Sequence, residues 1–184
     1  MSVGVVNHSE SKGNFANYFD FFHLPQTFNL DRKLLDSAYL KIQQEVHPDR
    51  FARASDAEKR QSLQLATFAN TAYRTLKNPI QRGLYLCELH GLDPQLETNT
   101  SMPKNFLMQQ MELREAMDDA RGQIVHLSQL QDQVISDLKK ITDSIGKNFD
   151  ELKQPEAALI ELRAALFLER FLEELEQRIT DASE

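Results

Sequence analysis

The apolar residues of this chain recur at the spacing of an α-helix, and this pattern limits the folds open to it more than any other feature. No segment shows the two-residue alternation, bounded by turn residues, that indicates a strand. Prolines such as Pro25, Pro48 and Pro79 fall at the edges of the helical patterns, as expected for a residue that disrupts a helix interior. The sequence therefore predicts an all-α protein.

The first half of the chain predicts two long helices with shorter ones on either side. Asp31 is a suitable N-cap for the first long helix. This helix must end before Pro48, because proline disfavours helical geometry in the residue that precedes it. Ser55 and Glu58 have capping-box spacing at the start of the second long helix. A shorter helix follows, and Gly91 is its expected C-cap.

The second half predicts three amphipathic helices, at about 103–120, 122–148 and 155–180. Three such helices with short connections can bury one shared core, so a three-helix bundle is the simplest arrangement. The polar stretch 91–103 contains two prolines and looks like a linker. We therefore expect a mobile tail (1–14), an N-terminal domain with its connecting helix (15–91), a linker (92–102) and a C-terminal domain (103–184).

The charge of the chain differs between these two halves. Residues 14–91 contain ten Lys or Arg against eight Asp or Glu, whereas residues 92–184 contain ten against nineteen. The net charge of −7 argues against nucleic acid as the main partner. Cys87 is the single cysteine, which excludes an internal disulfide and fits a reducing compartment. With no membrane-length apolar run and no targeting pattern at the start, we expect a cytoplasmic protein.

The tripeptide His47-Pro48-Asp49 lies between the two long helices of the first half. From its residues alone it could be a loop that reverses the chain, a recognition element or an acid–base pair. Direct catalysis would need an orienting partner and a substrate pocket. The sequence offers no phosphate-binding glycine loop and no nucleophile motif, and its other histidines lack metal-ligand spacing. A metal- or nucleotide-dependent hydrolase remains the alternative from another class, and it predicts intrinsic turnover.

The order of elements resembles the J domain of DnaJ-type co-chaperones: a short aromatic helix, a longer helix, an HPD loop and a second long helix. A second signature behind the loop carries the resemblance further, at Asn70, Ala72, Tyr73, Leu76, Pro79, Arg82 and Tyr85. HPD alone would recur by chance, but HPD inside a helical hairpin followed by this signature is specific. The resemblance implies that the loop stimulates ATP hydrolysis by a DnaK-class chaperone.

The rest of the chain resembles the HscB type of co-chaperone, which serves bacterial iron–sulfur cluster assembly. The features are the HPDRF extension, the segment NFLMQQMELREAMDD (105–119) and the acidic C-terminal bundle, so that residues 16–180 are covered. The resemblance implies an HscA-type chaperone and an IscU-type scaffold protein as partners, with no cofactor and no enzymatic activity of its own. A J-domain co-chaperone for another client is the alternative within this class.

The resemblance also implies which residues face the chaperone: His47, Pro48, Asp49, Arg50, Lys41, Arg32 and Lys33. One feature departs from the common pattern, because the helix before the loop ends in KIQQEV rather than in a dense basic face. We therefore expect weaker electrostatic docking and a dedicated chaperone rather than a general one.

The helix at 103–120 contains more apolar residues than one bundle face needs. At 100° per residue, Gln110, Leu113 and Met117 lie within about 40° of Phe106 and form a suitable core face. A second apolar group falls on the outer half of the helix among carboxylates. Surplus apolar area of this kind marks either a partner contact or a second core face that packs against the J domain. The resemblance matches this outer surface to scaffold binding by Leu107, Met108, Met111, Glu112, Glu115 and Asp119, with Phe167 from the last helix.

Overall fold

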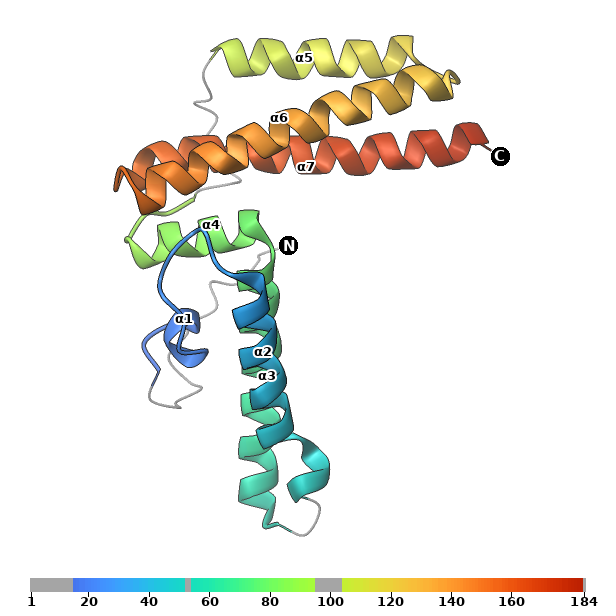
Figure 1. Ribbon diagram of the computed structural model, residues 1–184. Helices are drawn as coiled ribbons and strands as arrows, with labels where there is room; N and C mark the ends of the chain where they lie inside the picture. Colours follow the sequence, from blue (N-terminus) through green and yellow to red (C-terminus); the bar gives the residue numbers. More distant parts are fainter. Residues whose placement is uncertain (1–14, 52–53, 95–103, 184) are drawn as a thin grey trace. The chain divides into compact units, whose positions relative to one another are not determined.

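The computed structural model describes residues 15–51, 54–94 and 104–183, and all regular structure in these ranges is helical (Figure 1). This confirms the all-α prediction. The predicted tail, 1–14, and most of the predicted linker, 92–102, lie outside the described residues. The elements are α1 (Tyr18–Phe21), α2 (Arg32–Val46), the 3₁₀ turn η1 (Pro48–Phe51), α3 (Asp56–Lys77), α4 (Pro79–Leu89), α5 (Lys104–Asp119), α6 (Ile124–Asp150) and α7 (Pro155–Ser183).

The chain divides into two compact units, Met1–Arg82 and Gly83–Glu184. Their boundary falls inside α4, whereas the sequence placed a domain boundary after residue 91. Each unit has its own core of buried apolar residues.

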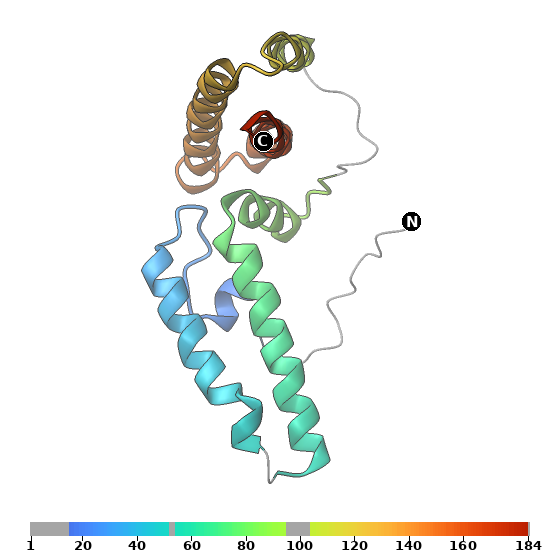
Figure 2. The same cartoon turned by 90° about the vertical axis from the view of Figure 1, so that its right-hand side faces the viewer.

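The first unit is built on the antiparallel hairpin of α2 and α3, which pack against each other and lie side by side in Figure 2. Asp31 caps α2 by accepting hydrogen bonds from the backbone N–H groups of Lys33 and Leu34. Ser55 and Glu58 form the predicted capping box at the start of α3. Both caps satisfy N–H groups that have no partner within the helix, and both confirm the boundaries expected from the sequence.

Aromatic side chains of α1 pack against α3 in this unit. The ring of Phe68 on α3 meets the rings of Tyr18 and Phe21 edge-on, with centroids 5.4 and 4.9 Å apart. Such edge-to-face contacts add stability beyond the burial of area. The chain leaves α1 through His23, whose φ of 55° lies in the left-handed region. A four-residue helix thus becomes part of the core of the hairpin.

A polar ladder also joins α2 to α3. The rings of Tyr39 and Tyr73 stack with centroids 4.0 Å apart. The Tyr39 hydroxyl donates to Asn70 Oδ1 at 2.8 Å, and the Tyr73 hydroxyl donates to Asp36 Oδ1 at 2.8 Å. Gln43 Nε2 also donates to Asn70, one turn further along α2. Asn70 and Tyr73, two residues of the J-type signature, thus help to hold the hairpin in register.

Helix α4 begins at Pro79 and is closed as the sequence predicted. Gly91 has a φ of 74°, its N–H donates to the Glu88 carbonyl, and the Leu92 N–H donates to the Cys87 carbonyl. This is the Schellman arrangement, for which glycine is favoured because it has no Cβ to clash in the left-handed region.

The second unit contains α5, α6 and α7 and confirms the predicted three-helix bundle (Figures 1 and 2). One cluster of its core consists of Met117, Ala120, Leu127, Val134, Leu168, Phe171 and Leu175. Towards one end of the bundle, Glu161 of α7 accepts hydrogen bonds from Ser144 at 2.7 Å and from Asn148 at 2.9 Å, both on α6. A buried polar group needs such partners, and these fix how α6 and α7 are aligned.

Candidate partner-binding surfaces

The HPD tripeptide forms the turn at the tip of the α2–α3 hairpin. His47 is the C-cap of α2, is exposed, and has an extended backbone with φ −61° and ψ 130°. Residues 48–51 follow as a 3₁₀ turn, in which the Arg50 N–H donates to the His47 carbonyl at 3.0 Å. The side chains of Pro48 and Asp49 lie outside the described part of the chain. The backbone therefore turns directly after His47, and the His47 side chain is exposed to solvent.

Two side chains hold this turn by bonding to carbonyl groups of the last turn of α2. Arg50 Nη1 donates to the Gln44 carbonyl at 3.1 Å. Ser62 of α3 donates through its hydroxyl to the Val46 carbonyl at 2.6 Å. Ser62 could not be recognised from the sequence, because a lone serine inside a helical pattern gives no signal until the helix is paired with its neighbour.

The predicted basic residues do not all lie near the loop. Lys41 is exposed, about two turns before the loop on α2, and Arg50 belongs to the loop itself. Arg32 and Lys33 lie in the first turn of α2, about 20 Å from His47 at 1.5 Å per residue. The structure thus brings Lys41 and Arg50 towards His47 and leaves Arg32 and Lys33 at the other end of the helix.

Arg32 is also engaged within the hairpin. Its Nε donates to Asp36 Oδ1 at 2.7 Å, and its Nη2 approaches the Tyr73 hydroxyl at 3.5 Å. The hydrogen bond from Arg32, together with the one from Tyr73, lowers the pKa of the Asp36 carboxyl. The same bond with Asp36 raises the pKa of Arg32. A chaperone that binds Arg32 must therefore compete with Asp36 and Tyr73 for its guanidinium group.

The outer face of α5 carries the surplus apolar residues, as helical phase predicted. The exposed fractions of Leu107, Met108 and Met111 are 43%, 61% and 71%, whereas Met117 on the opposite face is 2% exposed. Phe106, Gln110 and Leu113 are half-buried on that inner side. The phase prediction is thereby confirmed. Glu112, Glu115 and Asp119 are exposed on the same helix.

Phe167 occupies a different position from the other predicted scaffold-binding residues. It is half-buried on α7, its ring meets Phe106 edge-on with centroids 5.7 Å apart, and it stacks on Phe171 at 5.9 Å. Phe167 thus helps to seat α5 on α7, and only part of its ring can reach a partner.

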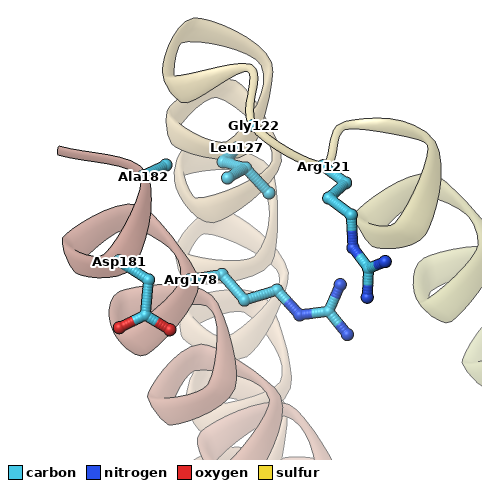
Figure 3. A pocket seen from close by; sticks show the side chains of 6 residues that line it. All are labelled: Arg121, Gly122, Leu127, Arg178, Asp181 and Ala182. Atoms are coloured by element: carbon cyan, nitrogen blue, oxygen red, sulfur yellow. The ribbon is translucent and has the colours of Figure 1, made fainter. Parts of the chain in front are cut away.

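A hollow of about 390 Å³ opens in the bundle near the α5–α6 turn. Figure 3 shows the guanidinium groups of Arg121 and Arg178 pointing towards each other, with Asp181 beside Arg178 on α7 and Leu127 above them in the view. Arg178 donates to Asp118 at 2.8 Å. Because Asp118 and Asp181 balance the two arginines, the hollow has no excess charge that would favour an ion. Among the described residues there is also no group of three metal-ligating side chains.

No helix in the described ranges is both long enough and apolar enough to cross a membrane.

Comparison with known proteins decides the family. A family model described as the HSCB C-terminal oligomerisation domain matches residues 102–176. The co-chaperone protein HscB homolog of Burkholderia multivorans is 42% identical over 169 residues, which covers 89% of this chain and 94% of that protein. The chain belongs to the HscB family of co-chaperones.

Solved structures of this family have the same architecture. The chaperone HscB from Vibrio cholerae has a TM-score of 0.78 at 32% identity and covers 88% of this chain and 96% of its own. Human co-chaperone HscB has a TM-score of 0.84 at 30% identity, and the match covers 90% of this chain and 83% of the human chain. The α2–α3 hairpin is therefore the J domain of an HscB-type co-chaperone, and α5–α7 form its C-terminal helical domain. The family is one of co-chaperones and not one of enzymes.

Proposed function

We propose that this co-chaperone stimulates the ATPase of a DnaK-class chaperone of the HscA type and delivers an IscU-type scaffold protein to it. The observation that carries the proposal is the pair of exposed features, His47 at the tip of the hairpin and the apolar group on α5. We assign His47 to the ATPase partner and the apolar group on α5 to the client protein. In this role the chain assists iron–sulfur cluster assembly and transfer.

The loop acts on the chaperone as an allosteric ligand. An effector shifts a two-state partner only by binding one state more tightly than the other. His47 and Arg50 lie on a turn held by hydrogen bonds to the end of α2, so the loop can bind without first paying the entropy of ordering. The loop contributes no chemical group to ATP cleavage, and the chain has no ATPase activity of its own.

The outer face of α5 suits a protein partner with a complementary apolar patch. Leu107, Met108 and Met111 are adjacent on one helical face, and methionine adapts its shape to irregular partners. Small apolar clusters of this kind carry most of the energy of an interface, while the surrounding polar groups exclude water. Glu112, Glu115 and Asp119 form such a surround and give the patch a negative potential.

The uneven charge of the chain supports two different protein partners. The C-terminal half carries the excess of acidic residues and the N-terminal half a slight excess of basic ones. Complementary charge raises association rates and selects between partners. We therefore assign the scaffold to the acidic bundle and the chaperone to the J domain, and no nucleic acid or cofactor to either.

The location we propose is the bacterial cytoplasm. The similar proteins of Burkholderia multivorans and Vibrio cholerae are bacterial. A single cysteine in 184 residues also fits a reducing compartment.

Steady-state ATP hydrolysis by an HscA-type chaperone tests the proposal. The purified chain should raise the hydrolysis rate, and an IscU-type scaffold should raise it further in the presence of the chain. The chain alone with ATP measures intrinsic turnover and should show none. No stimulation in either condition would overturn the proposal, while stimulation without any scaffold effect would point to a different client.

A further inference from the structure

Ser62 occupies an unusual position for a hydroxyl side chain in the middle of a helix. The residue is 3% exposed. Serine and threonine within helices commonly bond to the carbonyl four residues earlier, as Thr67 and Thr71 do here in the same α3. Ser62 instead donates across the hairpin to the Val46 carbonyl at 2.6 Å. Its hydroxyl therefore links α3 to α2 and does not bond within α3.

The acceptor of this bond is the last residue of α2. The four C-terminal carbonyl groups of a helix have no partner within it, and Val46 is 8% exposed, so water has little access to its carbonyl. His47 follows directly and leaves the helical conformation. The Ser62 bond thus fixes the peptide group from which the HPD turn departs.

The second bond that holds the turn is local. Arg50 donates to Gln44, six residues earlier, so it shapes the turn but does not attach it to α3. The contacts of Gln43 with Asn70 lie one turn further back on α2. Ser62 is therefore placed to set the direction of the loop relative to α3, the longer helix of the hairpin.

We propose that Ser62 is a positioning residue for the HPD loop, holding His47 in the orientation that a chaperone binds. The proposal rests on the function proposed above. If the loop samples other orientations without the bond, the apparent affinity for the chaperone falls by the fraction of molecules that remain competent. Once the partner is bound, the competent orientation is selected, so maximal stimulation is retained.

The test measures chaperone ATPase stimulation as a function of co-chaperone concentration. Ser62→Ala should raise the half-saturating concentration about three- to tenfold, with little change in maximal stimulation. Threonine keeps the hydroxyl, and valine has the shape of threonine without it. The half-saturating concentration of Ser62→Thr should therefore be closer to that of the natural protein than the value for Ser62→Val. An equal effect of Thr and Val would overturn the proposal, because bulk and not the hydroxyl would then be responsible.

A matched control separates positioning from general loss of stability. Ala72→Gly removes a fully buried methyl group in the same helix, far from the loop, and weakens the helix. Thr71→Ala deletes a hydroxyl that bonds within α3. Both should leave the half-saturating concentration unchanged, even where Ala72→Gly lowers Tm as much as Ser62→Ala. If Ala72→Gly raised the half-saturating concentration as much as Ser62→Ala does, the effect of Ser62→Ala would come from lost stability and the positioning role would be overturned.

Amide hydrogen exchange gives a readout that needs no chaperone. In Ser62→Ala, protection of the Arg50 N–H, which bonds to the His47 carbonyl, should fall at least several-fold relative to the N–H of Lys59 in α3, which bonds to the carbonyl of the N-cap residue Ser55. Unchanged Arg50 protection would overturn the proposal whatever the ATPase assay shows. If the natural protein fails to stimulate the chaperone, the proposed function fails, and the exchange result still decides whether Ser62 orders the loop.

Discussion

The ring of Phe106 on α5 meets the ring of Phe167 on α7 edge-on, with centroids 5.7 Å apart. This contact fixes which side of α5 faces the bundle. Because Leu107, Met108 and Met111 lie roughly 100–200° around the helix from Phe106, the same contact turns them outwards, where they are 43–71% exposed. The exposure of the apolar group is thus a consequence of how α5 is seated.

Truncation of this group tests its role in scaffold binding. Replacing Leu107, Met108 and Met111 together with Ala should weaken binding of an IscU-type scaffold by about 2–4 kcal/mol. The melting temperature should change little, because these side chains lie away from the core. Calorimetric titration measures the affinity. A control variant, Val125→Ala with Ile135→Ala, removes exposed apolar groups from α6 and should bind normally. Unchanged affinity of the triple variant would show that these three side chains do not bind the scaffold.

Charge reversal on the same helix should act on the rate of association. Glu112→Lys and Glu115→Lys should slow scaffold association about two- to tenfold at low salt and reduce its salt dependence, as rim charges do. Stopped-flow binding at several salt concentrations measures both. Glu173→Lys on α7 changes the net charge equally at an exposed site and serves as the control. A larger effect on dissociation than on association would place these carboxylates inside the interface and not at its rim.

Replacement of His47 tests the loop. His47→Gln should abolish stimulation of the chaperone ATPase and change Tm by only a degree or two, because an exposed residue has little packing to lose. Stimulation is measured by phosphate release and stability by a melting curve. His126→Gln, at an exposed histidine on α6, should stimulate normally. Persistent stimulation by His47→Gln would show that the loop is not the effector, and unfolding would show that His47 is structural.

Cys87 should be inert in the folded protein. It is fully buried in α4, and burial, with Glu156 and Glu88 nearby, raises the pKa of its thiol to about 12. The thiolate is the reactive form, so labelling by a disulfide reagent at neutral pH should be about a hundredfold slower than in urea. The raised pKa also means that this group favours folding fully below pH ~8.5 and loses that contribution as pH rises towards 12. Rapid labelling of the native chain would contradict the buried position.

Much of the architecture follows from local signals in the sequence. Asp31, the Ser55–Glu58 pair and Gly91 each act within one helical turn, so their caps could be predicted without knowledge of the fold. The phase of α5 could be predicted because Phe106, Leu113 and Met117 form one continuous stripe. Site roles, in contrast, came from resemblance, and those of the loop and of α5 stay predictions.

What the sequence did not predict depends on contacts between helices. Leu34 and Ile160 fit the apolar spacing of their helices, yet they are 55% and 50% exposed. In α2 the neighbouring Leu35 takes the buried position. In α7 the buried face near its start is set by Ala158 and Leu162, about 160–200° from Ile160 around the helix. Spacing alone cannot choose between two overlapping stripes, because the partner helix decides which of them is covered.

The central claim is that one chain joins the chaperone to the scaffold through two separate surfaces. It is tested most directly by mixing two variants, His47→Gln and the triple Ala variant of Leu107, Met108 and Met111, and measuring ATP hydrolysis by the chaperone with scaffold present. The natural protein should give the extra stimulation that depends on scaffold. The mixture should give no more than the basal stimulation of the triple variant, because neither chain carries both surfaces. Full scaffold-dependent stimulation by the mixture would contradict the account, since the two surfaces would then work without being joined in one chain.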